Sequence, residues 1–214
     1  MTQASLSPRG AAVWLRMALL LLLLTSGAAL ARAEPVPPDQ LLRERAQQVM
    51  AELKAGGEAL RSDEQKVYAL ANRLIFPLID FEAMGKLTLG KHWRRATPEQ
   101  RRAFIDAYKK LLVRTYTKSL RQYANQDIIF LPEKTRIRGK YATVYSEFVP
   151  GNGQPNISVV YSLRLKDGQW KAYDVTIDGL SLVKNYRTSF SREIADKGLD
   201  ALIHRLQEET RGLG

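Results

Sequence analysis

Few side chains in this sequence could perform acid and base chemistry, and they are widely separated. The two histidines, His92 and His204, lie far apart, and the chain has neither a cysteine nor an H-E-x-x-H pair. This residue set does not favour a zinc site. Asp80 with Glu82, and Glu133, could supply paired carboxylates, but no partner group accompanies them, so we expect solvated acids.

Asp174 is the one acid set among apolar residues, in the run Trp170–Ile177. It could be catalytic, or it could be a strand-end group paired with an arginine or a backbone amide. The second interpretation is favoured because no other residue completes a reaction centre around it. The G-x-S-x-G, Walker A and G-x-G-x-x-G signatures are all absent. The sequence therefore predicts a protein that is not an enzyme and that holds neither a metal nor a cofactor.

The first 33 residues differ in kind from the rest. Arg9 and Arg16 precede the apolar run Met17–Leu24, and small residues follow, with small-x-small sites at 29–31 and 31–33. This is the pattern of a cleaved secretory signal. A retained membrane anchor is the alternative, and the interruption of the apolar run at 25–27 argues against it.

Removal of residues 1–33 leaves 181 of the 214 residues, enough for a single domain with a real core, which we place at 39–210 after a flexible spacer at 34–38. The removed segment holds three of the 33 lysines and arginines and none of the 22 acids, which leaves a net charge of +8. An exported chain of this charge meets anionic lipid or acidic proteins rather than nucleic acid, and the alternative is that the charge serves only solubility. The absence of cysteine excludes disulfides and a lipid anchor on cysteine.

Helical patterns occupy residues 39–125. Leu42, Ala46, Val49 and Leu53 recur at helical spacing up to Gly56. Ser62 and Gln65 form a capping box for a second helix, which ends before Pro77. The third and strongest pattern has Thr97 as N-cap, Pro98 at the first position and Gln100 closing the box.

From Asp127 the period changes to two. Four or five antiparallel strands are expected within 127–178, among them a hairpin whose Asp167-Gly168 turn joins Ile157–Leu163 to Trp170–Ile177. Closing helices are expected over 185–210, with Gly179–Tyr186 as a hinge. The order predicts an α+β fold: a twisted antiparallel meander packed against several helices, with an apolar cavity between them.

Two blocks of this sequence resemble the MlaC family of periplasmic proteins, also called toluene-tolerance proteins. The first block runs from Phe81-Glu82-Ala83-Met84 through Leu89–Arg94 to Ala96–Arg101, with Leu111-Leu112 and Thr115-Tyr116. The second comprises Val160-Tyr161, Trp170–Val175, Gly179–Val183 and Asn185-Tyr186-Arg187 with Phe190. The resemblance spans about Gln40 to Leu206.

The resemblance implies a monomeric periplasmic carrier without a permanent anchor, whose cargo is a glycerophospholipid. Such proteins move lipid between an outer-membrane lipoprotein complex and an inner-membrane ABC transporter that carries an MCE-domain subunit, which maintains the asymmetry of the outer membrane. The acyl chains enter a cavity between sheet and helices. Two chains would need the upper end of the range of ~300 to 1,000 Å³ that is usual for ligand pockets, or more.

The candidate cavity walls follow from the hairpin and from the helices before it. One wall would be formed by Ile157, Val159, Tyr161, Leu163, Tyr173, Val175 and Ile177. The other would be formed by Phe76, Leu78, Phe81, Met84, Leu89, Leu112 and Tyr116. Arg187 is a candidate for contact with a lipid head group or a partner protein. Alternation assigns these strand residues to one face, but ordinary core packing gives the same pattern.

Two other classes of function stay open at this point. An exported hydrolase would depend on one acid or histidine, and a structural adaptor of the cell envelope would have a filled core and no cargo.

Overall fold

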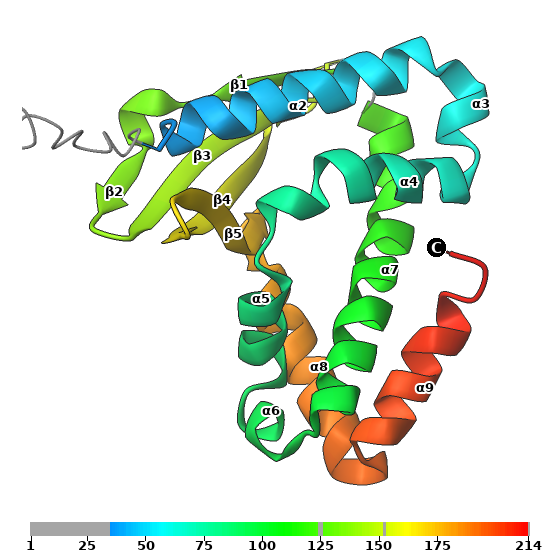
Figure 1. Ribbon diagram of the computed structural model, residues 1–214. Coiled ribbons are helices and arrows are strands. Elements are labelled where there is room, and N and C mark those ends of the chain that lie inside the picture. Colours follow the sequence, from blue (N-terminus) through cyan, green and yellow to red (C-terminus); the bar gives the residue numbers. More distant parts are fainter. Residues whose placement is uncertain (1–34, 124–125, 152, 214) are drawn as a thin grey trace, which may run out of the picture. The chain divides into compact units, whose positions relative to one another are not determined.

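The computed structural model describes residues 35–123, 126–151 and 153–213, which belong to one compact unit that begins at Pro35 (Figure 1). The predicted export signal falls on residues outside this range. The chain forms mixed helix and antiparallel sheet, as the sequence predicts.

The described part of the chain begins with three helices, α2 (Pro38–Ala55), α3 (Gly57–Arg61) and α4 (Glu64–Leu74). The short α3 was not predicted. The predicted cap of α4 is off by one residue: Asp63 is the N-cap, and its Oδ1 accepts hydrogen bonds from Gln65 N (3.0 Å) and Lys66 N (3.2 Å). Ser62 instead donates to Glu58 O (2.7 Å), because α3 ends there. A carboxylate satisfies two free amides of the first turn and also favours the helix dipole.

The segment after α4 folds into a 3₁₀ turn, η1 (Phe76–Leu78), and two helices, α5 (Phe81–Leu89) and α6 (Lys91–Arg95). The long helix α7 (Pro98–Tyr123) follows. Its predicted capping box is confirmed, since Gln100 N donates to Thr97 Oγ1 (3.2 Å) and Thr97 N donates to Gln100 Oε1 (3.0 Å).

Six strands form one antiparallel sheet. Their bounds are β1 (Asp127–Phe130), β2 (Arg136–Arg138), β3 (Tyr141–Val149), β4 (Ile157–Lys166), β5 (Gln169–Ile177) and β6 (Leu180–Ser181), with a 3₁₀ turn η2 (Pro132–Lys134) after β1. The order is β1-β3-β4-β5-β6, and β2 also pairs with β3. The predicted hairpin is confirmed as β4 and β5, with positive φ at Asp167 (52°) and Gly168 (77°). The strict meander is wrong at its start, because β1 and β2 share one edge of β3.

The pairing of β4 with β5 contains a bulge that the sequence pattern did not reveal. Ser162 lies opposite Asp174 and Leu163 opposite Ala172, so Tyr173 is an extra residue on β5. A bulge of this kind bends its strand and changes which residues share a face. Ala172 therefore lies on the same face as Val175 and Ile177, and Tyr173 does not.

Two helices close the chain, α8 (Leu182–Lys197) and α9 (Leu199–Glu209). The helix α8 begins earlier than predicted, so most of the expected hinge at Gly179–Tyr186 is helical. Ser181 is its N-cap, with Oγ accepting from Lys184 N (3.0 Å) and donating to Asp174 Oδ2 (2.6 Å). Val183 N donates to Asp174 Oδ1 (3.2 Å). Asp174 is thus a structural partner that ties β5 to the start of α8.

The buried apolar side chains of the described residues fall into four clusters. The largest, which we call the helical core, comprises Phe81, Met84, Leu89, Trp93, Phe104, Ala107, Tyr108, Val183, Phe190, Ile194, Leu202, Ile203 and Leu206. A second, the sheet cluster, comprises Leu42, Phe130, Ala142, Val144, Leu163, Trp170 and Ala172. Two smaller clusters join α2 to α4 and α4 to α7. A domain of this size usually has one contiguous core, so the division itself requires an explanation.

Candidate functional site

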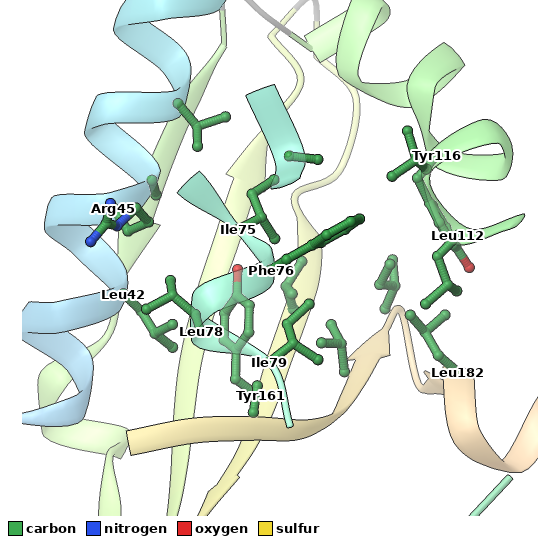
Figure 2. Close-up of a pocket in the computed structure, with 18 of the residues that line it drawn as sticks. Leu42, Arg45, Ile75, Phe76, Leu78, Ile79, Leu112, Tyr116, Tyr161 and Leu182 are labelled. Carbon is green, nitrogen blue, oxygen red and sulfur yellow. The ribbon is translucent and has the colours of Figure 1, made fainter. Parts of the chain in front are cut away.

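A cavity of about 470 Å³ lies where the four clusters meet. Its lining includes Leu42, Ala46 and Tyr161 from the sheet cluster or its margin, Phe81 and Met84 from the helical core, and Val49 and Ala71 from the two smaller clusters. The clusters stay separate because this space lies between them. Figure 2 shows the lining side chains converging on it from α2, η1, α7 and the sheet.

The sheet supplies a continuous apolar wall, and its register explains why. Phe148 lies opposite both Ile128 and Ile157, Val159 lies opposite Ile177, and Tyr161 lies opposite Val175. Side chains directly opposite one another on paired strands share a face. These seven residues therefore line the cavity together with Ala172, which the bulge brings to the same face.

Eleven of the fourteen residues predicted for the cavity walls do line the cavity. They are Phe76, Leu78, Phe81, Met84, Leu112, Tyr116, Ile157, Val159, Tyr161, Val175 and Ile177. Contact of these residues with a lipid stays a prediction.

The other three predicted wall residues lie elsewhere. Leu89 is eight residues beyond Phe81 on α5, about 12 Å along the helix axis, and is buried in the helical core. Leu163 has the predicted face but lies past Tyr161, buried in the sheet cluster. Tyr173 is the bulged residue, and its ring packs edge-on against Tyr141 at 6.3 Å instead.

Arg187, predicted for head-group or partner contact, is exposed on α8 and lies outside the cavity lining. Its guanidinium covers Gly90, where an added Cβ would lie 3.0 Å from Arg187 Nη2. Gly90 also has φ 55° and ψ −120°, a conformation open mainly to glycine. This close approach locates Arg187 at the junction of α5 and α6.

The sequence prediction missed a whole wall, the one formed by α2 and α4. The missed lining residues are Leu42, Arg45, Ala46, Val49, Met50, Ala71, Ile75, Ile79, Val113, Ile128, Phe148, Ala172 and Leu182. The helical spacing of Leu42, Ala46 and Val49 did signal a buried stripe. The strand residues Ile128 and Phe148 could have been found only from the pairing of β1 with β3.

Polar groups are sparse in the cavity wall. Among the described lining residues, Arg45 alone is charged, and the hydroxyls come from Tyr116 and Tyr161. Burial raises the pKa of both tyrosines above the ordinary value, so both are neutral. Figure 2 shows Tyr161 between Leu78 and Ile79, and Tyr116 on the side of Leu112.

The link from η1 to α5 closes one side of the cavity and is fixed by polar contacts on its other side. Ile79 lines the cavity and forms a parallel bridge with Ala172, and Asp80 N donates to Ala172 O (2.8 Å). The Asp80 carboxylate, 4% exposed, is paired with Arg164, lies 3.7 Å from Lys166 and accepts from Ala83 N (3.0 Å). Burial would raise the pKa of Asp80, but the Ala83 amide and the two cations outweigh it and hold the pKa below its ordinary value.

The other candidates for acid and base chemistry are not assembled into a site. Glu82 lies 3.9 Å from Lys166, on the far side of the same link, beside a second and more polar hollow. Burial and the neighbouring Lys91 and Arg95 lower the pKa of His92. Among residues 35–123, 126–151 and 153–213, no three histidine or acidic side chains gather as metal ligands would. The same ranges contain no helix whose length and hydropathy suit a transmembrane span.

Comparison with known proteins shows to which family this chain belongs. Residues 43–208, most of the chain, match the protein family described as "MlaC protein". The chain belongs to the MlaC family. A relative from Pseudomonas putida, the toluene tolerance protein ttg2D, is 31% identical over 182 residues, 85% of this chain and 83% of the relative.

Two further similarities concern lipid. The intermembrane phospholipid transport system binding protein MlaC of Haemophilus influenzae is 23% identical over 173 residues, 80% of this chain and 81% of that protein. A phospholipid-binding protein from Ralstonia solanacearum, solved in complex with a phospholipid, is 30% identical. It superposes with a TM-score of 0.73 over 80% of this chain and 96% of that one. The MlaC fold of this chain is thus shared with a structure that holds a phospholipid.

Proposed function

We propose that this MlaC-family protein is a carrier for glycerophospholipids that shields their acyl chains in the cavity between the sheet and the helices. The observation that carries the proposal is the apolar hollow where the four clusters meet, in place of one filled core. An ordinary structural adaptor would gain stability by filling that space. The phospholipid held by the Ralstonia solanacearum relative supports the same conclusion.

The free energy of lipid transfer suits a carrier that releases its lipid again rather than a protein that retains it. Transfer of lipid chains out of water gains about 0.8 kcal/mol per methylene, so a diacyl lipid with ~30 methylenes gains on the order of 20 kcal/mol. A donor membrane offers a similar gain. A wall made almost wholly of aliphatic and aromatic groups therefore balances the membrane without trapping the lipid, and docking partners must set the direction of transfer.

The size of the cavity adds a condition. About 470 Å³ lies in the lower half of the range for ligand pockets, below the upper end that two acyl chains require. A diacyl lipid would therefore need the walls to move apart. We expect the lipid-loaded protein to have a larger cavity than the one described here.

The route we propose runs through the periplasm, between an outer-membrane lipoprotein complex and an inner-membrane ABC transporter with an MCE-domain subunit. The predicted export signal supports this compartment, and the name of the Haemophilus influenzae relative supports intermembrane transport. The net charge of +8 after signal removal would favour docking to acidic surfaces. Arg187, exposed beside Gly90, remains our candidate for such a contact. We expect the carrier to act as a monomer without a resident cofactor.

The test is mass spectrometry of an organic extract from folded protein purified without detergent. Wild-type protein should yield phospholipid in stoichiometric amount. Val175→Trp should fill the cavity and reduce this amount at least tenfold, because Val175 lines it. Val160→Trp is the matched control, since Val160 pairs with Tyr145 and Thr176 on the opposite face. Absence of lipid from repeated wild-type preparations would refute the carrier function.

A further inference from the structure

Arg45 is the one feature of the cavity wall that an apolar cargo alone does not explain. It is half-buried on α2, and no other described lining residue carries a charge. Figure 2 draws its guanidinium on the outer, α2 side of the lining, away from Phe76 and Tyr161. A guanidinium at the rim of an apolar cavity needs an anion or water to satisfy its five donors.

The carboxylates on the same helix are already engaged. Asp39 pairs with Arg43 at 3.7 Å, Glu44 accepts from Gln40 Nε2 at 2.8 Å, and Glu52 pairs with Arg73. Within the part of the chain that the structure describes, no carboxylate forms an ion pair with Arg45. The charge is therefore available to a ligand.

The two sides of the cavity wall differ in polarity: the α2 side carries the charge of Arg45, and the opposite side is mainly apolar. Figure 2 shows Arg45 beside Leu42 on the α2 side, with Leu112 and Leu182 across the cavity. Tyr116 also lies across the cavity, but its hydroxyl is neutral and cannot compensate a negative charge. An amphiphile with one anionic end and apolar chains gains most when its anion faces α2 and its chains extend toward α7 and the end of β5.

We propose that Arg45 binds the phosphate of the lipid and so fixes its orientation, with the head group at α2. The inference rests on the proposed carrier function. A phosphodiester is common to glycerophospholipids, and a guanidinium can bind two of its oxygens at once, which lysine cannot. The apolar surroundings strengthen this contact relative to one in open water.

The test compares two probes with identical acyl chains, phosphatidylglycerol and diacylglycerol, the second of which lacks the phosphate. Both are offered in equal amounts to the delipidated full-length protein, and the bound ratio is measured. Wild-type protein should favour phosphatidylglycerol. Arg45→Gln should reduce this preference about tenfold, as expected for one charge-assisted contact, and Arg45→Lys should keep part of it. Lys54→Gln is the matched control, because Lys54 is an exposed cation of α2 outside the cavity lining.

The outcomes separate the two proposals. If wild-type protein binds neither probe, the carrier function fails and this inference fails with it. If wild-type protein binds lipid but Arg45→Gln leaves the ratio unchanged, or lowers both probes equally, the carrier function stands and the role of Arg45 is refuted. The ³¹P resonance of bound phosphatidylglycerol supplies a second readout: it should shift in Arg45→Gln and Arg45→Lys and should not shift in Lys54→Gln.

Discussion

The helical core and the cavity wall are built from the same kinds of side chain, yet one is filled and the other is hollow. In the helical core, the Phe104 ring is stacked on Tyr108 at 5.4 Å and lies edge-on to Phe190 at 5.9 Å. Phe104 itself is fully buried. At the cavity wall, Val175 and Ile177 have large apolar groups too, but part of each side chain lines the cavity instead of packing against a neighbour.

The difference lies in which elements meet. In the helical core, side chains of α5, α7, α8 and α9 pack against one another. Around the cavity, a bent sheet faces α2, α4 and the η1 turn, and the polar contacts of Asp80 and Asp174 hold the boundary between the two regions. Residue type therefore does not decide whether a region is filled, and the arrangement of elements does.

The largest expected effect concerns the filled region. Phe104→Ala should lower the free energy of unfolding by about 4 kcal/mol, because it removes a ring from a closely packed site and leaves a void. Ile157→Ala, a large-to-small substitution at the cavity wall, should cost clearly less. Chemical denaturation of the lipid-free proteins measures both, and equal losses would contradict the distinction between the two regions.

The next effect concerns the boundary. Asp80→Asn should cost about 2 kcal/mol at neutral pH, because it weakens a helix cap and leaves Arg164 without its carboxylate. The native pKa of Asp80 lies below its ordinary value, so its contribution is present at neutral pH and is lost as the pH falls through the native pKa. The variant should therefore show a flatter loss of stability below about pH 4.

The control for Asp80 is Glu82→Gln, which removes a nearby exposed carboxylate whose distance to Lys166 is 3.9 Å. Its unfolding free energy should stay within about 0.5 kcal/mol of the wild-type value. A loss as large as that of Asp80→Asn would show that net charge, rather than the specific contacts of Asp80, stabilises the boundary.

A smaller effect is expected where β5 meets α8. Ser181→Ala should cost about 1 kcal/mol, because it removes the N-cap hydroxyl and one of the donors to Asp174. Ser189→Ala, at an exposed position inside α8, should be nearly neutral. Thermal unfolding followed by circular dichroism compares the pair, and equal melting temperatures would argue against the cap.

The smallest effect on stability is expected for a residue of the cavity wall. Ile177→Ala should cost no more than about 1 kcal/mol in lipid-free protein, because part of this side chain has no neighbour to lose. In lipid-loaded protein the cost should rise, since the same methyl groups would then contact acyl chains. A cost that is unchanged by loading would place the cargo elsewhere.

The sequence sufficed for much of this architecture because local signals agreed with the fold. Thr97, Pro98 and Gln100 located the start of α7, and Asp167-Gly168 located the hairpin. Helix caps and tight turns depend on neighbouring residues alone, so they can be predicted without tertiary structure.

The site was harder to predict because it depends on contacts distant in sequence. Tyr173 was assigned to the cavity face by simple alternation, and the bulge reverses that assignment. Leu163 is on the predicted face but is buried within the sheet cluster. That cluster includes Leu42 of α2, so the burial of Leu163 depends on where α2 packs. The α2 stripe itself was recognised as buried, but spacing along one helix does not reveal that Arg45 and Val49 face a hollow.

The extra residue in β5, Tyr173, affects the shape of the cavity wall more than its composition. The inward residues Trp170, Ala172, Val175 and Ile177 would alternate without interruption if Tyr173 were deleted, so the deletion would keep the same apolar set. It would remove the bend instead. The curvature of this wall is therefore encoded by the number of residues in the strand rather than by their identity, and a change of length at this one position would alter the cavity more than most substitutions along it.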